Sequence, residues 1–185
     1  SNVAEANAVS KIFVNTNLAA AGGVMGALMI SKIMFGKSDL TMALNGAIAG
    51  LVSITAEPLA PTPGLATIIG AVGGLLVVFS IITLDRLKLD DPVGAISAHG
   101  TAGIWGLLAV VFTTGTLSAQ LYGIAVIFGW TFVVSSLFWY AIHLTYGLRV
   151  SEEDEEEGCD IGECGLDAYP EFTKSSVRGP SVYPK

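Results

Sequence analysis

The sequence has few charged residues, which argues against a soluble protein. Only 14% of its 185 residues are Asp, Glu, Lys or Arg, whereas an average soluble domain carries about 25%. Hydrophobic residues make up 52%, and they form continuous runs rather than one face of a periodic pattern, as is typical of segments solvated by lipid. The net charge of −7 is consistent with this interpretation, because the acidic residues concentrate at positions 152–157, outside the apolar runs.

Other absences exclude further classes. No patch of Lys and Arg is present, so nucleic-acid binding is not supported. The two cysteines, Cys159 and Cys164, have neither a second pair nor a nearby histidine, which argues against a zinc site. In the cytosol they would be free thiols. Residues 1–10 are mixed and polar and do not form a signal-peptide pattern. We expect no metal, no cofactor and no enzymatic activity.

Five apolar segments predict an all-α, polytopic membrane protein with five transmembrane helices. We place them at about residues 9–35, 40–57, 65–87, 92–113 and 117–150, followed by a polar tail at 151–185 whose end we expect to be disordered. Pro92 is well placed at a helix start, with Asp90 or Asp91 as the cap. We interpret these two acids as structural rather than as a cation site, because a carboxylate complements the helix dipole.

The distribution of basic residues predicts the topology. Lys32 and Lys37 flank the first connection, Arg86 and Lys88 flank the third, and Arg149 follows the last helix. The second and fourth connections carry no Lys or Arg. Because basic residues favour the cytoplasmic side, we expect a cytosolic tail and an external N-terminus. Pairs of glycines at helical spacing, such as Gly46 and Gly50, should allow close approach between helices.

His99 is the most informative residue, since no charge lies between Asp91 and the end of its apolar segment. An ionisable group at membrane depth is costly and usually faces a pathway or a partner. An imidazole both donates and accepts hydrogen bonds and titrates near neutral pH. A histidine that lines a solute pathway is one interpretation; a histidine bonded to a neighbouring backbone in a helix bundle is the other. We assign Trp105, on the same segment, to packing.

Several motifs resemble those of the ammonium transporter family (Amt/Mep, relatives of the Rh proteins). The pattern at 90–106 is Asp-Asp-Pro, six residues, His-Gly and two further glycines at intervals of three. Similar matches occur at residues 13–16, 45–56, 147–150, 158–161 and 168–169. The resemblance implies helices seven to eleven of an eleven-helix fold built from inverted halves, in a plasma-membrane homotrimer. The first half, with a partner histidine, and the sixth helix, with most of the outer ammonium site, are not in these residues. We therefore expect a fragment, a truncated product or one chain of a split transporter.

The resemblance also implies residue roles. His99 matches one of two histidines that line the family's narrow, apolar pore, and Thr55 and Asn45 match its inner pathway, where we also expect Ala95. An ammonium ion is costly to dehydrate at low dielectric. Ammonia is far cheaper to dehydrate, and an imidazole can accept its hydrogen bonds or take a proton. Such a pore should reject sodium and potassium, which cannot deprotonate. Whether the net cargo is ammonia or ammonium stays open.

The tail carries a second set of implied roles. By itself the acidic run is typical of a solvated segment. In the family this region couples subunits and contacts a PII-type signalling protein, roles that Gly158, Asp160 and Tyr169 match. Cys164-Gly165-Leu166 departs from the common His-Gly-Glu, and Gly162 replaces a phosphorylatable threonine of some relatives. This puts the PII contact in doubt and excludes phosphorylation at that position. Besides transport, the chain could act as an ammonium sensor or as a non-conducting regulatory subunit.

Overall fold

The structure, a computed structural model, describes residues 2–166. Within these residues all regular secondary structure is helical, and no strand occurs. In chain order the elements are α1 (Val3–Phe35), α2 (Leu40–Ile54), α3 (Pro63–Arg86), the π-helix η1 (Ile96–Thr101), α4 (Ala102–Ala109), the 3₁₀ turn η2 (Val110–Phe112), α5 (Leu117–Thr145), α6 (Glu152–Glu157) and α7 (Cys159–Cys164). The chain divides into two units between Thr131 and Phe132, and each is described by itself.

Three helices are long and apolar enough to cross a membrane, namely α1, α3 and α5. The other two predicted spans are shorter apolar helices, Leu40–Ile54 and Ile96–Phe112. At 1.5 Å per residue, the 15 residues of α2 rise about 23 Å, which is less than the roughly 30 Å of a bilayer's hydrocarbon core. Length and composition therefore identify three spans, where the apolar segments predicted five.

Several helix ends differ from the prediction. Helix α1 begins at Val3, not Val9, because Asn2 and Glu5 form a capping box ahead of the apolar run. Helix α2 ends at Ile54, three residues before the predicted end, and a turn follows; Pro58 disfavours helical backbone at the residue before it. Helix α5 ends at Thr145 instead of reaching Val150, and Gly147 follows with φ +82°.

The fourth predicted helix differs most. We expected one helix from Pro92 to Thr113, but Pro92 and Val93 form a turn, and Gly94 has φ +72°. Regular π-helix starts only at Ile96, continues as α4 and ends in the 3₁₀ turn η2. Gly94 is required because a Cβ there would lie 2.7 Å from Asn45 Oδ1, and because its positive φ disfavours other residues. Proline thus starts a turn here rather than the helix.

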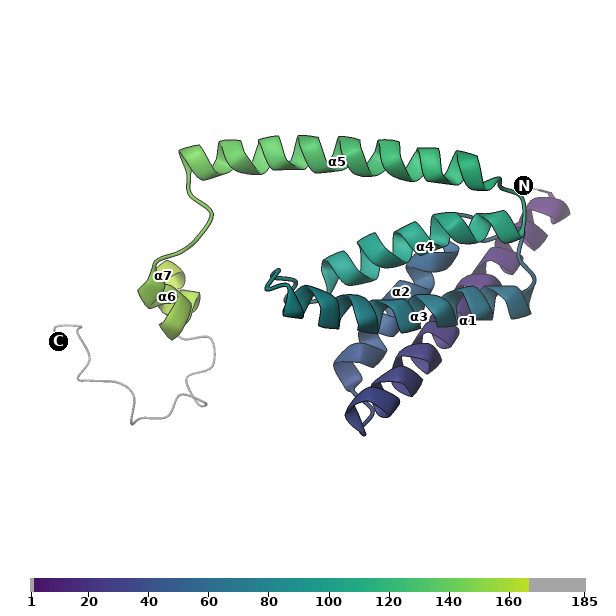
Figure 1. The fold of residues 1–185 in the computed structure, drawn as a ribbon, viewed down its shortest axis with the longest axis horizontal. Helices are drawn as coiled ribbons and strands as arrows, with labels where there is room; N and C mark the ends of the chain where they lie inside the picture. Colours follow the sequence, from purple (N-terminus) through teal and green to yellow (C-terminus); the bar gives the residue numbers. More distant parts are fainter. Residues whose placement is uncertain (1, 167–185) are drawn as a thin grey trace. The chain divides into compact units, whose positions relative to one another are not determined.

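Glycines hold the first three helices together. Helix α1 packs against both α2 and α3, which also contact each other (Figure 1). A Cβ at Gly23 would overlap the Gly46 carbonyl oxygen on α2, and one at Gly70 on α3 would overlap the Ala19 carbonyl oxygen on α1. The predicted packing role is therefore confirmed for Gly46, Gly50, Gly70, Gly74 and Gly106, whereas Gly103 has only a side chain 3.8 Å away.

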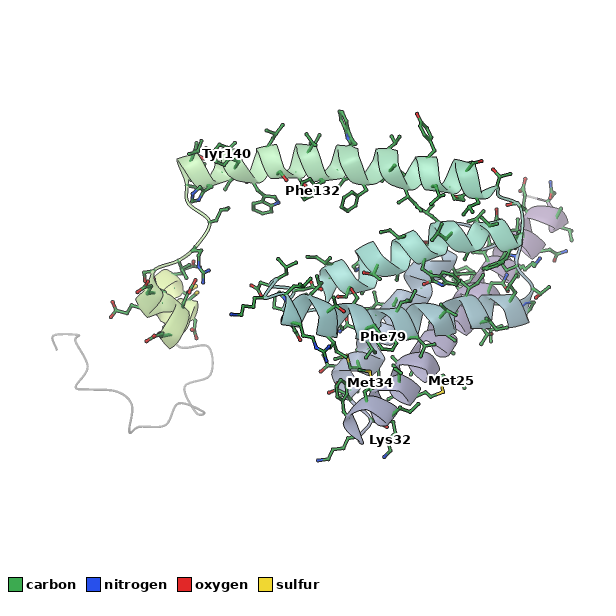
Figure 2. The ribbon with its side chains drawn as sticks, in the orientation of Figure 1. Met25, Lys32, Met34, Phe79, Phe132 and Tyr140 are labelled. Carbon is green, nitrogen blue, oxygen red and sulfur yellow. The ribbon has the colours of Figure 1, made fainter. Side chains whose placement is uncertain are left out.

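The large apolar side chains lie mainly on the outside. Met25 on α1 and Phe79 on α3 are exposed (Figure 2), while alanines, with a few valines and isoleucines, fill the core between the helices. Helix α5 has no buried residue at all. Small residues inside and large apolar residues outside form the pattern expected of helices that associate in lipid.

Candidate functional site

His99 lies within the π-helix η1, on an exposed position of the first unit. Its imidazole has no hydrogen-bond partner among residues 2–166, so both ring nitrogens are available to a solute or to another chain segment. π-Helices are rare and often occur at functional sites. The structure therefore presents an unpaired donor and acceptor on an unusual backbone segment.

A cavity of about 540 Å³ adjoins this histidine. Its lining comes from the end of α2, from η1 and α4, and from the first part of α5, all within the first unit. Most of these residues are aliphatic or glycine, and the polar side chains among them are those of Thr55, His99, Thr101 and Thr131. The Thr55 hydroxyl, directly after α2, donates to the Val52 carbonyl of that helix at 2.6 Å. The site is a largely apolar space with one imidazole.

Asp91 ties the entry of η1 to the preceding loop. Its Oδ1 accepts the Ile96 N–H at 2.9 Å, and its Oδ2 accepts both the Ser97 N–H and the Ser97 hydroxyl at 3.0 Å. Burial alone would raise the pKa of Asp91, but these hydrogen bonds outweigh it and hold the pKa below its ordinary value. Asp90, in contrast, makes no side-chain hydrogen bond within the described chain, so the cap belongs to Asp91 alone.

Two interhelical hydrogen bonds near the site were not predicted. The hydroxyls of Ser80 on α3 and Thr101 in η1 lie 2.8 Å apart. The indole Nε1–H of Trp105 donates to the Ile69 carbonyl of α3 at 2.9 Å, so this residue does more than fill space. Both bonds join segments far apart in sequence. In the sequence they are indicated only by polar side chains within apolar runs, which do not identify their partners.

The predicted pathway residues do not all line the same cavity. Thr55 shares the cavity of His99, but Asn45 lines another cavity of about 410 Å³ together with Asp85, Asp90 and Asp91. The Asn45 side-chain amide donates to the Thr41 carbonyl at 3.2 Å, and its Oδ1 is buried without a partner. Ala95 is exposed at the start of the helical segment and lines neither of these two cavities.

The predicted tail residues belong to the second unit. Gly158 has φ +102° and joins α6 to α7, and its N–H donates to the Asp154 carbonyl at 2.9 Å. A Cβ at Gly158 would approach Asp160 Oδ1 at 2.9 Å, so glycine suits this junction. Tyr169 lies outside the described residues. Within residues 2–166 no group of three His, Cys, Asp or Glu side chains is placed to hold a metal.

An ion pair in the tail was not predicted. Arg149 binds Glu155 through two hydrogen bonds, from Nε at 2.8 Å and from Nη2 at 2.7 Å. The hydrogen bonds and charge of this guanidinium hold the pKa of the Glu155 carboxyl below its ordinary value. The pair joins the residues that follow α5 to the first tail helix.

Known proteins resemble this chain over most of its length. A sequence model described as Ammonium Transporter Family matches residues 1–169. Ammonium transporter Amt2 of Archaeoglobus fulgidus is 36% identical, with 93% of this chain and 42% of the relative aligned. Ammonium transporter Amt1 of Haloferax mediterranei is 38% identical, with 91% of this chain and 34% of the relative aligned.

Solved structures agree with these matches. A structure titled Sensor Amt Protein superposes with a TM-score of 0.80 at 30% identity, covering 88% of this chain and 43% of the other. Candida albicans Mep2 superposes with a TM-score of 0.70 at 27% identity, covering 83% of this chain and 40% of the other. The chain thus spans about two fifths of the length of the proteins it resembles.

Proposed function

The chain belongs to the ammonium transporter family, and we propose that it forms one side of a membrane pore through which ammonia or ammonium passes, with His99 as the group that handles the solute. The observation that carries this proposal is the exposed, unpaired imidazole of His99 beside a largely apolar cavity. A polar group in such a setting would cost free energy unless it found a hydrogen-bonding partner.

The chemistry of the site suits ammonia better than a hydrated cation. Removing the water shell of an ion at low dielectric is costly, and this side of the cavity has no carboxylate to offset that cost. Ammonia loses little on entering, and the free ring nitrogens of His99 can accept its hydrogen bond or its proton. Thr55, in the same cavity, is a further polar group on the proposed path. Sodium and potassium would be rejected because they cannot shed a proton.

We further propose that helices from the N-terminal half of a family member complete the pore. The supporting observations are the exposure of His99 and the absence of any buried residue on α5. In such an assembly the shorter helices Leu40–Ile54 and Ile96–Phe112 would also serve as spans. The assembled transporter would be a plasma-membrane homotrimer, with an external N-terminus and a cytosolic tail according to the distribution of basic residues.

Uptake of methylammonium, an ammonium analogue, tests this proposal in cells that lack their own transporters. We would compare this chain alone with the chain joined to the N-terminal half of a relative, each with and without His99→Ala, and use His143→Ala on α5 as the histidine control. We expect uptake from the joined protein only, altered by His99→Ala and not by His143→Ala. Selective conduction by the chain alone in liposomes would contradict the proposed half-pore, and an unchanged His99→Ala variant would contradict the role of the histidine.

Sensing is the second candidate function, favoured by the superposition on the structure titled Sensor Amt Protein. In this case the tail, with Gly158 and Asp160, would report ammonium binding to a PII-type protein or a neighbouring subunit. Fluorescent labelling of Cys159 in α7, which is exposed, would follow this response, with Cys164→Ser leaving a single thiol. A signal that depends on ammonium and requires His99, without uptake, would favour the sensor over the transporter.

A further inference from the structure

The orientation of His99 has no side-chain support of its own. Its imidazole has no hydrogen-bond partner within residues 2–166, whereas functional histidines are commonly oriented by a bond to the second ring nitrogen. The ring position therefore depends on the backbone of η1. The His99 carbonyl accepts the Ala102 N–H, so the His99 backbone is linked to the first residue of α4.

The π-helix is attached to its surroundings at two polar points. At its start Asp91 accepts three hydrogen bonds from Ile96 and Ser97. At its end the Thr101 hydroxyl pairs with the Ser80 hydroxyl at 2.8 Å, in a partly buried position. Between them Ala98 is 1% exposed, and it packs in one core cluster with Val77 and Val78 of α3.

Alanine and valine contacts do not by themselves define a rotation of one helix against another. Apolar packing is non-directional, whereas a hydrogen bond restricts both distance and angle. A π-turn has wider hydrogen bonding than the α-helix and occurs mostly as short insertions. The Ser80–Thr101 bond is the directional link between η1 and the long helix α3, two residues beyond His99.

We propose that Ser80 and Thr101 are positioning residues that hold η1 in its π-helical form and thereby direct His99 toward the solute. This inference rests on the proposed function, since it assigns a task to the imidazole. Neither hydroxyl needs to contact the solute. Removing one hydroxyl leaves the other unpaired and partly buried, so each single substitution should weaken the hold on η1.

The first test measures methylammonium uptake by the transporter in which this chain is joined to an N-terminal half. Thr101→Val removes the hydroxyl with little change of shape, and Ser80→Ala removes its partner. We expect each to lower uptake about three- to tenfold, as befits one neutral hydrogen bond, and the double variant to be no worse than the more affected single variant. Thr101→Ser keeps the hydroxyl and should restore uptake.

The matched control is Thr83→Val, one turn further along α3. The Thr83 hydroxyl donates only to the Phe79 carbonyl of its own helix, at 2.7 Å, and is exposed. This variant should transport normally. The inference is overturned if Thr101→Val behaves like Thr83→Val, or if it lowers the uptake remaining in the His99→Ala variant by the same factor as in the parent. If His99→Ala alters uptake and Thr101→Val does not, this inference is wrong and the proposed function is unaffected.

A second measurement uses the chain in detergent micelles and needs no transport. Amide hydrogen exchange, read by mass spectrometry, should accelerate across residues 96–101 in Thr101→Val and Ser80→Ala but not in Thr83→Val. Exchange in α1 should stay as in the parent, which would show that the bundle is folded. Unchanged exchange across residues 96–101 would overturn the inference, whatever the state of the joined transporter.

Discussion

A single carboxylate oxygen of Asp91 accepts hydrogen bonds from both donors of Ser97. The backbone N–H and the hydroxyl of Ser97 each donate to Asp91 Oδ2 at 3.0 Å, across six residues of chain. With the Ile96 N–H on Oδ1, the acid satisfies the first free donors of η1 from outside the helix. The loop before the π-helix thus anchors the segment that carries His99.

Replacing Asp91 should destabilise the fold, and replacing Asp90 should not. Asp91→Ala removes the acceptor for three donors, and we expect a loss of about 1–2 kcal/mol in unfolding free energy, the range of a helix cap. Asp90→Ala is the matched control, since Asp90 makes no side-chain hydrogen bond among the described residues. Thermal unfolding in micelles gives the comparison. Equal losses for the two variants would show that local charge, not the cap, matters.

The Asp91 contribution should fade in acid. Its pKa in the folded protein lies below the ordinary value of 3.8, so the folded state binds the proton less readily than the unfolded chain. This stabilisation is complete above the unfolded pKa and is lost as pH falls through the folded pKa. We expect the melting-temperature gap between the parent and Asp91→Asn to shrink between about pH 5 and pH 2. A gap that widens in acid would refute the assignment, and Asp90→Asn serves as the reference.

Adding a methyl group at Gly23 should disrupt the bundle. A Cβ there would overlap the Gly46 carbonyl oxygen, and the backbone of Gly50 lies about as close as contact allows. Because backbone must move, we expect Gly23→Ala to cost about 2 kcal/mol or more. Gly123→Ala on α5, where nothing lies within 4 Å, should instead be neutral or stabilise by up to about 1 kcal/mol. Folded yield and thermal unfolding would measure both, and a well-folded Gly23→Ala variant would argue against the observed packing.

Trp105→Phe should loosen the contact between α3 and α4. The change keeps an aromatic ring but removes the Nε1–H that donates to the Ile69 carbonyl. We expect a loss of about 1 kcal/mol, as for one neutral hydrogen bond. Trp130→Phe is the control, because Trp130 on α5 is 73% exposed. Equal melting temperatures for the two variants would mean that the indole hydrogen bond contributes nothing to stability.

Much of the protein follows from its sequence. Long apolar runs cannot be solvated by water, and backbone in lipid must bond internally, so helices are the remaining solution for this chain. Proline and glycine between the runs separated the helices to within a few residues at most ends. The motif around His99 indicated the ammonium transporter family, and the family match over residues 1–169 confirms it. The helix start at Pro92 and the end of the last helix at about Val150 were wrong.

Tertiary structure decided the rest, because the deciding contacts join residues that are distant in the chain. Ser80 and Thr101 are 21 positions apart, and Ile69 and Trp105 are 36 apart, so no periodicity links them. Gly94, in the turn that delays η1, has a positive φ, and the Asn45 side chain beside it leaves no room for a Cβ. The sequence by itself determined that a histidine would sit in an apolar helical segment, since composition and spacing are local properties. Only the packing of segments distant in sequence decided that Thr55, but not Asn45, would share the cavity of His99.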